Sequence, residues 1–272
     1  MVGPGAKIQA PVGSAATGTI TVHDGASLFV VGVEIDLRNG PFRCLGMSAL
    51  SAVRLEDVGV TAIQATYGGS QFTIDKCAAT FRSVDLTLNG IVVSNDGGLD
   101  ADRMQLRPSV DHASVSAIGS RMTLRIVNSV LYDGQVLVSE QDQAPSISNV
   151  YLAFSTIYST FAIAMNCNNS SAGNWMARVE NNVFAGATSN ALVGTTCIAN
   201  HNVLFPQSDI VPGSNIVQDP RFVDATMHDL RLRSDSPAID VAVPSPQLST
   251  DHDVNGRARP QGGAPDIGAY EF

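Results

Sequence analysis

The protein has 272 residues, of which 44% are hydrophobic and 15% are charged, and its formal net charge is −9. This apolar fraction excludes a disordered chain, and the length allows one large domain or two small ones. The negative charge and the low lysine content (Lys7 and Lys76 only) exclude a general nucleic-acid-binding surface, which needs positive charge. No run of about 18 apolar residues occurs, so we predict no membrane span.

The chain begins with MVGPGAKIQAPVG, which lacks the basic and apolar segments of a signal peptide. The residues that follow, up to Ile35, already alternate like the repeats described next. We therefore expect that Met1 is a fragment boundary, and that further repeats or a secretion signal precede it.

From residue 28 to residue 205 one pattern recurs eight times, at intervals of 19 to 27 residues. One position anchors each copy; it is apolar, as are nearly all residues two before and five after it. The residues directly beside the anchor are more polar, and such period-two alternation is typical of a β-strand with one buried face. The anchors are Val30, Leu55, Phe81, Ala101, Ile126, Leu152, Val179 and Ile198.

Two residues after the anchor, most copies have Gly, Asp, Ser or Asn, which favour bends. Each copy therefore predicts a strand, a tight bend, a second strand and a variable connection, with no segment of helical periodicity. We also expect Asn128, Asn181 and Asn200 to form a hydrogen-bonded ladder in this bend column.

This repeat predicts an all-β fold, a right-handed parallel β-helix of about eight to nine coils stacked about 4.8 Å apart. An antiparallel β-sandwich is the alternative, but it does not explain columns that keep their register over eight copies. We assign residues 1–217 to the coils and residues 218–272 to a last coil and a loop-rich cap.

The four cysteines, Cys44, Cys77, Cys167 and Cys197, form no C-x-x-C pair and no metal-binding spacing with histidine. They allow three disulfide connectivities. We favour buried free thiols over disulfides, and the sequence leaves this choice open.

Charged residues gather beside the anchors of neighbouring copies, which places them on the outside of one parallel sheet. Arg82, Asp100, Asp102, Arg125 and, on the next coil, Tyr151 form the predicted binding surface for a polysaccharide. Alternating Arg and Asp also stabilise adjacent strands, by about 0.2–1 kcal/mol per pair, without any function. Convergence of the four charged residues on a cleft would favour catalysis, whereas flat, paired charges would favour binding alone.

No motif identifies catalytic residues, and the candidates are Arg82, Arg125, Asp100 and Asp102. Asp96, Asp100 and Asp102 are weak candidates for Ca²⁺ ligands, because calcium needs several hard oxygen ligands. With Ca²⁺, an arginine could neutralise a uronate and support β-elimination. If the protein is not a lyase of this kind, we predict that it has no cofactor.

The repeat ends before DPRFVDA (219–225), LRLRSDSPAID (230–240), DVNGRARP (253–260) and DIGAYE (266–271). These segments closely resemble the C-terminal signature of bacterial β-helix surface proteins with a choice-of-anchor Q domain, in the pectate-lyase-like superfamily. The resemblance implies an exported protein held at the cell surface, and it implies no particular reaction. The coils share only the general β-helix pattern with that superfamily.

The C-terminal segment has the composition of a structural cap. Asp253, Asn255 and Gly256 predict a tight turn. Arg259 has candidate carboxylate partners in Asp253 and Asp266, and we expect Ile267 and Tyr270 to cover the last apolar coil.

Together these features predict an extracellular or cell-surface protein, monomeric, that presents a rigid face to a polysaccharide and is not catalytic. The alternative is a polysaccharide lyase that acts on a uronate polymer by β-elimination, or another carbohydrate-active enzyme. Because many functions share this fold, the fold does not decide between them.

Overall fold

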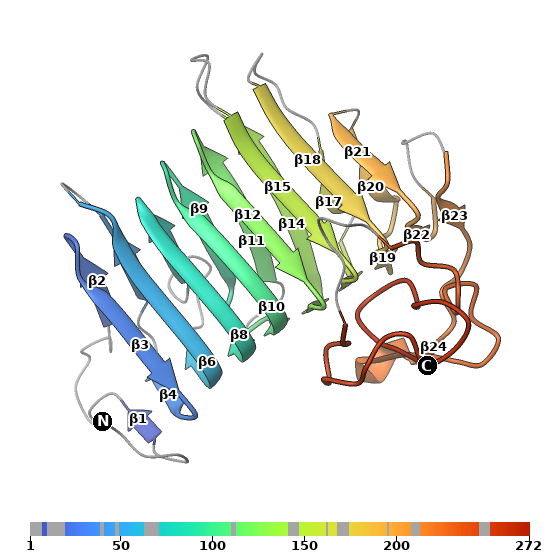
Figure 1. Cartoon of the computed structure of the whole chain (residues 1–272), viewed down its shortest axis with the longest axis horizontal. Helices are drawn as coiled ribbons and strands as arrows, with labels where there is room; N and C mark the ends of the chain where they lie inside the picture. The colour runs from blue at the N-terminus through green and yellow to red at the C-terminus, as the bar shows by residue number, and fades with distance from the viewer. Residues whose placement is uncertain are drawn as a thin grey trace.

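The computed structural model describes residues 7–9, 20–38, 41–46, 49–62, 71–109, 113–140, 147–161, 163–167, 174–194, 196–207, 213–244 and 251–272. These residues confirm the predicted parallel β-helix, in which the strands of successive coils stack along one axis (Figure 1). Among the described strands the only antiparallel pair, β24 (Phe222–Asp224) with β25 (Asp229–Leu232), lies outside the coils. This arrangement excludes the β-sandwich.

The coils have three faces, which we number in chain order from β3. Face 1 consists of β3 (Ser27–Val31), the first halves of β6 (Ser51–Ala62), β8 (Cys77–Thr87) and β10 (Gly98–Arg107), and then β12 (Thr123–Val127), β15 (Ile147–Ala153), β18 (Asn174–Glu180) and β21 (Cys197–Asn200). Face 2 consists of β1 (Lys7–Gln9), β4 (Glu34–Arg38), the second halves of β6, β8 and β10, and then β13 (Val130–Tyr132), β16 (Thr156–Tyr158), β19 (Val183–Ala185), β22 (Val203–Leu204) and β23 (Ile216–Val217). Face 3 is a separate sheet of β2 (Ile20–His23), β5 (Phe42–Leu45), β7 (Gln71–Asp75), β9 (Gly90–Ser94), β11 (Ala113–Gly119), β14 (Gly134–Glu140), β17 (Ile163–Asn166) and β20 (Asn190–Val193).

A residue with left-handed backbone separates face 1 from face 2 in each of the eight coils whose strands on both faces the structure describes. Its φ angle lies between 47° and 62° at Gly32, Asp57, Ser83, Arg103, Asn128, Phe154, Asn181 and His201. This confirms the predicted bend column in seven coils. The stacked strands impose the same turn even on Arg103 and Phe154, whose side chains do not favour it.

The eighth coil differs from the prediction by one residue. Val179 pairs with Ala199, so the anchor is Ala199 and not Ile198, which is 50% exposed. The physical reason is that this register turns Cys197 inward, where it reaches Cys167. The bend residue of this coil is accordingly His201.

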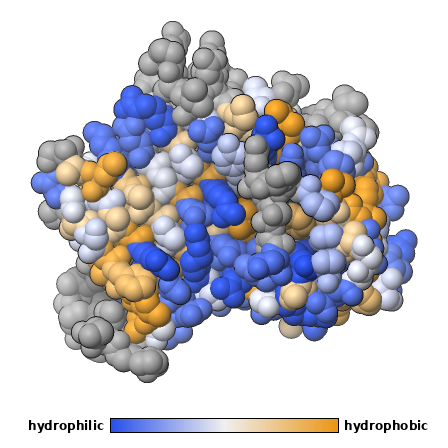
Figure 2. All heavy atoms as spheres, in the orientation of Figure 1, coloured by the Kyte–Doolittle hydropathy of each residue, from blue (hydrophilic) through white to orange (hydrophobic). Residues whose placement is uncertain are grey.

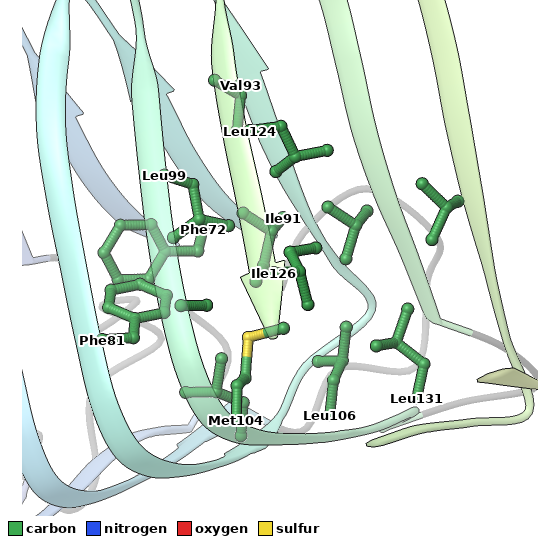
Figure 3. Packing of buried hydrophobic residues seen from close by; sticks show 14 of the residues in the cluster. Phe72, Phe81, Ile91, Val93, Leu99, Met104, Leu106, Leu124, Ile126 and Leu131 are labelled. Atoms are coloured by element: carbon green, nitrogen blue, oxygen red, sulfur yellow. The ribbon is translucent and has the colours of Figure 1, made fainter. Parts of the chain in front are cut away.

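The inner sides of the three faces share one apolar core that runs through successive coils (Figure 3). Phe72 stacks on Phe42 with ring centroids 4.2 Å apart and meets Phe81 edge-to-face at 5.1 Å. All three rings are fully buried, and a buried side chain of this size contributes about 1.5–3 kcal/mol. Because the contacts run between coils, no coil is stable alone.

The predicted ladder of Asn128, Asn181 and Asn200 is not formed; a ladder of serines and asparagines runs instead through the residue after the left-handed bend. Five side-chain oxygens each accept a backbone N–H from the preceding coil at 2.9–3.2 Å; they belong to Ser129, Ser155, Asn182, Asn202 and Asn215. Asn128 and Asn181 instead bond outward, to the Asp102 side chain and the Val243 carbonyl. The left-handed bend explains the difference, because the residue after it is the one that faces inward.

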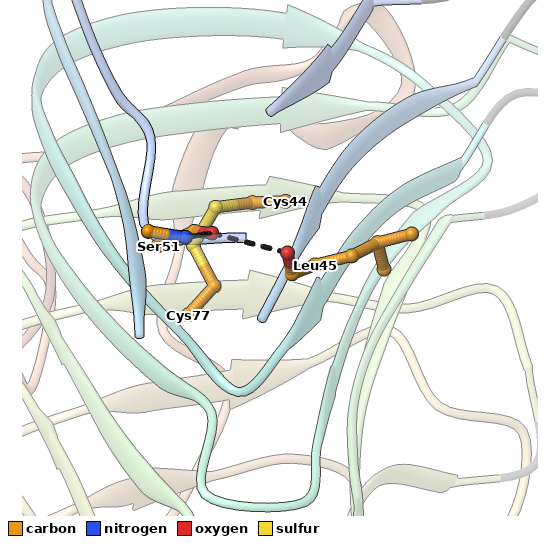
Figure 4. The surroundings of a disulfide bond; sticks show 5 residues. Cys44, Leu45, Ser51 and Cys77 are labelled. Carbon is orange, nitrogen blue, oxygen red and sulfur yellow. Dashed lines mark hydrogen bonds between the residues drawn. A yellow bond between two sulfur atoms is a disulfide. The ribbon is translucent and has the colours of Figure 1, made fainter. Parts of the chain in front are cut away.

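Two disulfides link neighbouring coils, so the preference for free thiols was wrong. Cys44 bonds to Cys77, which Figure 4 shows beside Ser51 and Leu45, and Cys167 bonds to Cys197. Both pairs lie at the corner between face 3 and face 1. There the end of one coil comes next to the start of a following coil, with Cα atoms 5.8 and 5.7 Å apart.

The segment from Gln218 to Phe272, which we call the tail, packs along the side of the coils. Ile267 joins an apolar cluster with Val127, Phe154 and Val183, and the hydroxyls of Tyr270 and Tyr132 lie 3.0 Å apart. Ile267 and Tyr270 therefore do not cover the last coil alone, because their clusters reach back to Val127 and Val130. They cover outward-facing apolar side chains of successive coils, whose burial stabilises this position.

Three consecutive tail residues reach three consecutive coils. The N–H of Gly268 donates to the Asn181 carbonyl at 2.9 Å, that of Ala269 donates to Thr156 Oγ1 at 3.0 Å, and Tyr270 contacts Tyr132. Gly268 has a φ of 102°, and a Cβ there would lie 2.8 Å from a methyl group of Val183. The tail therefore crosses the strands, and glycine is needed where it comes closest.

Arg259 is buried in the tail and pairs with Glu271, at 2.9 Å, instead of with Asp253 or Asp266. Asp253 instead accepts the N–H groups of Asn255 and Arg257, which confirms the predicted turn. No helix in the described part of the chain is long and apolar enough to cross a membrane.

Candidate functional site

The outer side of face 1 carries the residues that the sequence singled out. Parallel pairing aligns the residue before each anchor into a row of Phe29, Arg54, Thr80, Asp100, Arg125, Tyr151, Arg178 and Ile198. The residue after each anchor forms a second row of Val31, Glu56, Arg82, Asp102, Val127, Ala153, Glu180 and Asn200. In the view of Figure 2, hydrophilic residues gather across the middle coils, with more apolar residues toward the N-terminal coils.

Asp100 lies between two arginines from neighbouring coils. One carboxylate oxygen is 2.5 Å from Arg82 Nη2 and the other is 2.8 Å from Arg125 Nη1. Burial by itself raises the pKa of Asp100, but the hydrogen bonds from Arg82 and Arg125 outweigh it and hold the pKa below its usual value. The cluster is therefore ionised at neutral pH and carries one excess positive charge.

Asp102 does not join this cluster. Its side chain, which is 16% exposed, accepts a hydrogen bond from Asn128 Nδ2 at 2.9 Å and lies 3.1 Å from His252 Nε2. His252 belongs to the tail, so Asp102 holds the tail against the coils. The sequence placed Asp102 in the binding set because its periodicity gives no information about the tail.

Tyr151 follows Arg125 in the first row and is half-buried, next to the apolar cluster under the tail. Arg54 and Arg178 lie in the same row, and the predicted binding surface included neither of them. The column alignment was the signal that could have found them. Arg54 pairs with Glu56 at 2.8 Å and lies over the Phe29 ring.

Asp96 lies at the corner between face 3 and face 1, where both of its carboxylate oxygens bond to Arg121. This hydrogen bonding lowers the pKa of Asp96 below its usual value, against the smaller effect of burial. The surrounding depression has a volume of about 620 Å³ and includes Asp75, Lys76 and Asn95.

The three candidate calcium ligands thus have different partners. Within the ranges that the structure describes, no group of three His, Cys, Asp or Glu side chains is placed to hold a metal ion. Asp96, Asp100 and Asp102 are therefore not brought together.

Face 1 also has a depression of about 280 Å³ over the N-terminal coils, between Phe29, Ala52, Arg54 and Thr80. The charged cluster lies outside this depression. The cluster of Arg82, Asp100 and Arg125 is consequently a paired surface feature on the sheet.

Comparison of the sequence with models of known families finds no matching family, and comparison with curated proteins finds no match. The fold and the site define the class of protein at this level: an all-β parallel β-helix with a charged, ion-paired outer face.

Proposed function

We propose that the protein is an exported or cell-surface β-helix protein that binds an acidic polysaccharide on face 1 without cleaving it. The observation that carries the proposal is the Arg82–Asp100–Arg125 cluster, with its excess positive charge on a broad parallel sheet. Arg178 extends this charge along the same row. Coils repeat about every 4.8 Å, which is close to the length of one sugar unit, so an extended chain can meet successive coils.

The lowered pKa of Asp100 supports a role in binding over a role in hydrolysis. Glycoside hydrolysis by two carboxylates needs one that stays protonated, with a raised pKa. The pKa of Asp100 is lowered, and Asp102 is engaged by Asn128 and His252. Both arginines of the cluster are already paired with Asp100, which disfavours a role as the base of a lyase.

Two features support an extracellular location. Both disulfides lie in the coils, and disulfides persist mainly in oxidising compartments. The segments that resemble the choice-of-anchor Q signature contain the buried residues that hold the tail, including Asp253, Arg259 and Glu271. We therefore propose membership of this family, a polysaccharide as the partner, and no cofactor.

Binding to a panel of polygalacturonate, alginate, hyaluronate and dextran tests the proposal. We expect affinity for at least one acidic polymer and none for dextran. Arg125→Gln and Arg178→Gln should each weaken binding about tenfold, the loss expected for one charge-assisted hydrogen bond. The matched control is Arg231→Gln, an exposed tail arginine that pairs with Asp229.

The same panel, followed by absorbance of an unsaturated product with and without Ca²⁺, tests the lyase alternative. A product signal that disappears in Arg125→Gln would replace our proposal with the lyase. Absence of binding to every polymer would refute it outright.

A further inference from the structure

A pocket of about 300 Å³ lies where the tail meets face 2, outside the charged cluster of face 1. Tyr158 of β16 and Phe205, just after β22, contribute its wall from the coils. Phe222, Arg221 and Arg233 contribute the opposite wall from the tail, and Asp219 lies at its rim. The pocket therefore exists only when the tail is docked.

Aromatic rings from three separate parts of the chain line this pocket. Tyr158 and Phe222 meet edge-to-face with centroids 6.3 Å apart, and Phe205 is 36% exposed. Gly186 also lines the pocket, and a Cβ there would lie 2.7 Å from the Tyr158 ring, so glycine keeps the space beside this ring open. Exposed ring faces suit the C–H face of a pyranose.

The polar groups at the pocket include both hydrogen-bond donors and acceptors, and the arginines are paired with carboxylates. Arg221 bonds to Asp235 at 2.9 Å, and Arg233 lies 3.5 Å from the same carboxylate. Asp219 Oδ1 accepts the Arg221 N–H at 2.8 Å, which leaves its second oxygen available to a ligand. Two arginines and one aspartate line the pocket, and Asp235, which pairs with both arginines from outside the lining, brings the local net charge to zero. The pocket therefore favours a neutral ligand over an anionic one.

Tyr158 adds a hydroxyl that has no hydrogen-bond partner among the residues that the structure describes. Burial, and then the nearby charge of Asp133, raise the pKa of Tyr158. The hydroxyl therefore stays protonated and can donate to a ligand oxygen. A carboxylate and a guanidinium each match two adjacent hydroxyls, because each has two parallel acceptor or donor positions.

We propose that this pocket binds one neutral pyranose unit, with its C–H face against Phe205 and Phe222 and its hydroxyls on Tyr158, Asp219 and Arg233. The volume is at the lower end of ligand pockets and suits a single sugar unit. This site is independent of polymer binding on face 1, since it shares no residue with the charged cluster there.

The test is a titration of the full chain with glucose, galactose, mannose and glucuronate, followed by saturation-transfer NMR and calorimetry. We expect one neutral sugar to bind with a dissociation constant of about 1 mM, as ligand size suggests, and glucuronate to bind more weakly. Tyr158→Phe and Asp219→Asn should each weaken binding about three- to tenfold, the loss of one hydrogen bond.

Tyr151→Phe and Arg125→Gln are the matched controls on face 1 and should leave binding of the monosaccharide unchanged. The proposal is overturned if no neutral sugar binds, if glucuronate binds more tightly than every neutral sugar, or if Tyr158→Phe and Asp219→Asn both retain full affinity. Loss of polymer binding in Arg125→Gln with retained sugar binding separates this site from face 1.

Discussion

The ion pair between Arg259 and Glu271 allows a quantitative test of what holds the tail. Their side chains are 0% and 1% exposed, and Arg259 Nη1 lies 2.9 Å from Glu271 Oε2. The guanidinium also donates to the carbonyls of His252, Asp266 and Gly268 and lies 5.0 Å from the centroid of the Phe154 ring. The tail is thus built around one buried cation.

Glu271→Gln keeps the shape of the side chain and removes its charge. Burial lowers the pKa of Arg259, and the charges of Glu271, Asp253 and Asp266 oppose this effect, so the guanidinium stays charged at neutral pH. Removing one partner of a buried pair costs about 3–5 kcal/mol. We expect the lower end, because Asp253 and Asp266 remain. A loss of about 3 kcal/mol raises the population of the undocked tail roughly 100-fold.

Hydrogen exchange measures this opening residue by residue. In Glu271→Gln, exchange should accelerate at the amides of Val254, Ile267 and Gly268, whose bonds to Ala269, Ala238 and Asn181 close the tail. Exchange in β8 and β10 should not change. The control is Glu56→Gln, which breaks an exposed pair with Arg54 and should cost no more than about 1 kcal/mol. If both variants exchange alike, the carbonyls alone hold Arg259 and our reasoning is wrong.

Three further outcomes are expected. Replacing both Cys44 and Cys77 by Ala should lower the free energy of unfolding by about 3–4 kcal/mol, the loop-closure value for a separation of 33 residues; an unchanged denaturant midpoint would contradict it. Asn182→Ala should cost about 2–4 kcal/mol, because it leaves the Ser155 N–H and the Leu152 and Glu180 carbonyls unpaired; the exposed Asn95→Ala, measured by the same thermal melts, should cost far less. The lowered pKa of Asp100 means that its contribution to stability is complete above about pH 4 and is lost as the pH falls through its folded-state pKa. Asp100→Asn should therefore flatten the acid limb of melting temperature against pH, and parallel curves would count against this pairing.

The sequence predicted the coils well because inward alternation repeats in register. It failed where two adjacent columns carry similar residues. Asn181 and Asn182 are both bend-compatible, and only the left-handed φ of the first assigns the ladder to the second. The disulfides depend on which coil corners meet, and the separations of 33 and 30 residues do not specify a corner.

In the candidate site, contacts between neighbouring coils were predictable from the repeat, and contacts with the tail were not. Asp100 and Arg125 are direct cross-strand neighbours, so the repeat alone brings them together. The contact of Asp102 with His252 was not predictable, because His252 lies 150 residues away in a segment without periodicity. The pocket beside Tyr158 was invisible for the same reason, since the tail supplies half of its lining.

The way the tail crosses the strands limits how the protein can change in length. Its contacts with Asp102, Tyr132, Thr156 and Asn181 fall on successive coils. All four can form together only when the number of coils between β10 and β19 stays the same. An extra coil between β12 and β15 would move Asn181 about 4.8 Å away from Gly268 and break the set. An extra coil before β8 would leave all four contacts intact. Insertion or loss of a whole repeat between β10 and β19 should therefore undock the tail, whereas a change on the N-terminal side of β10 should not.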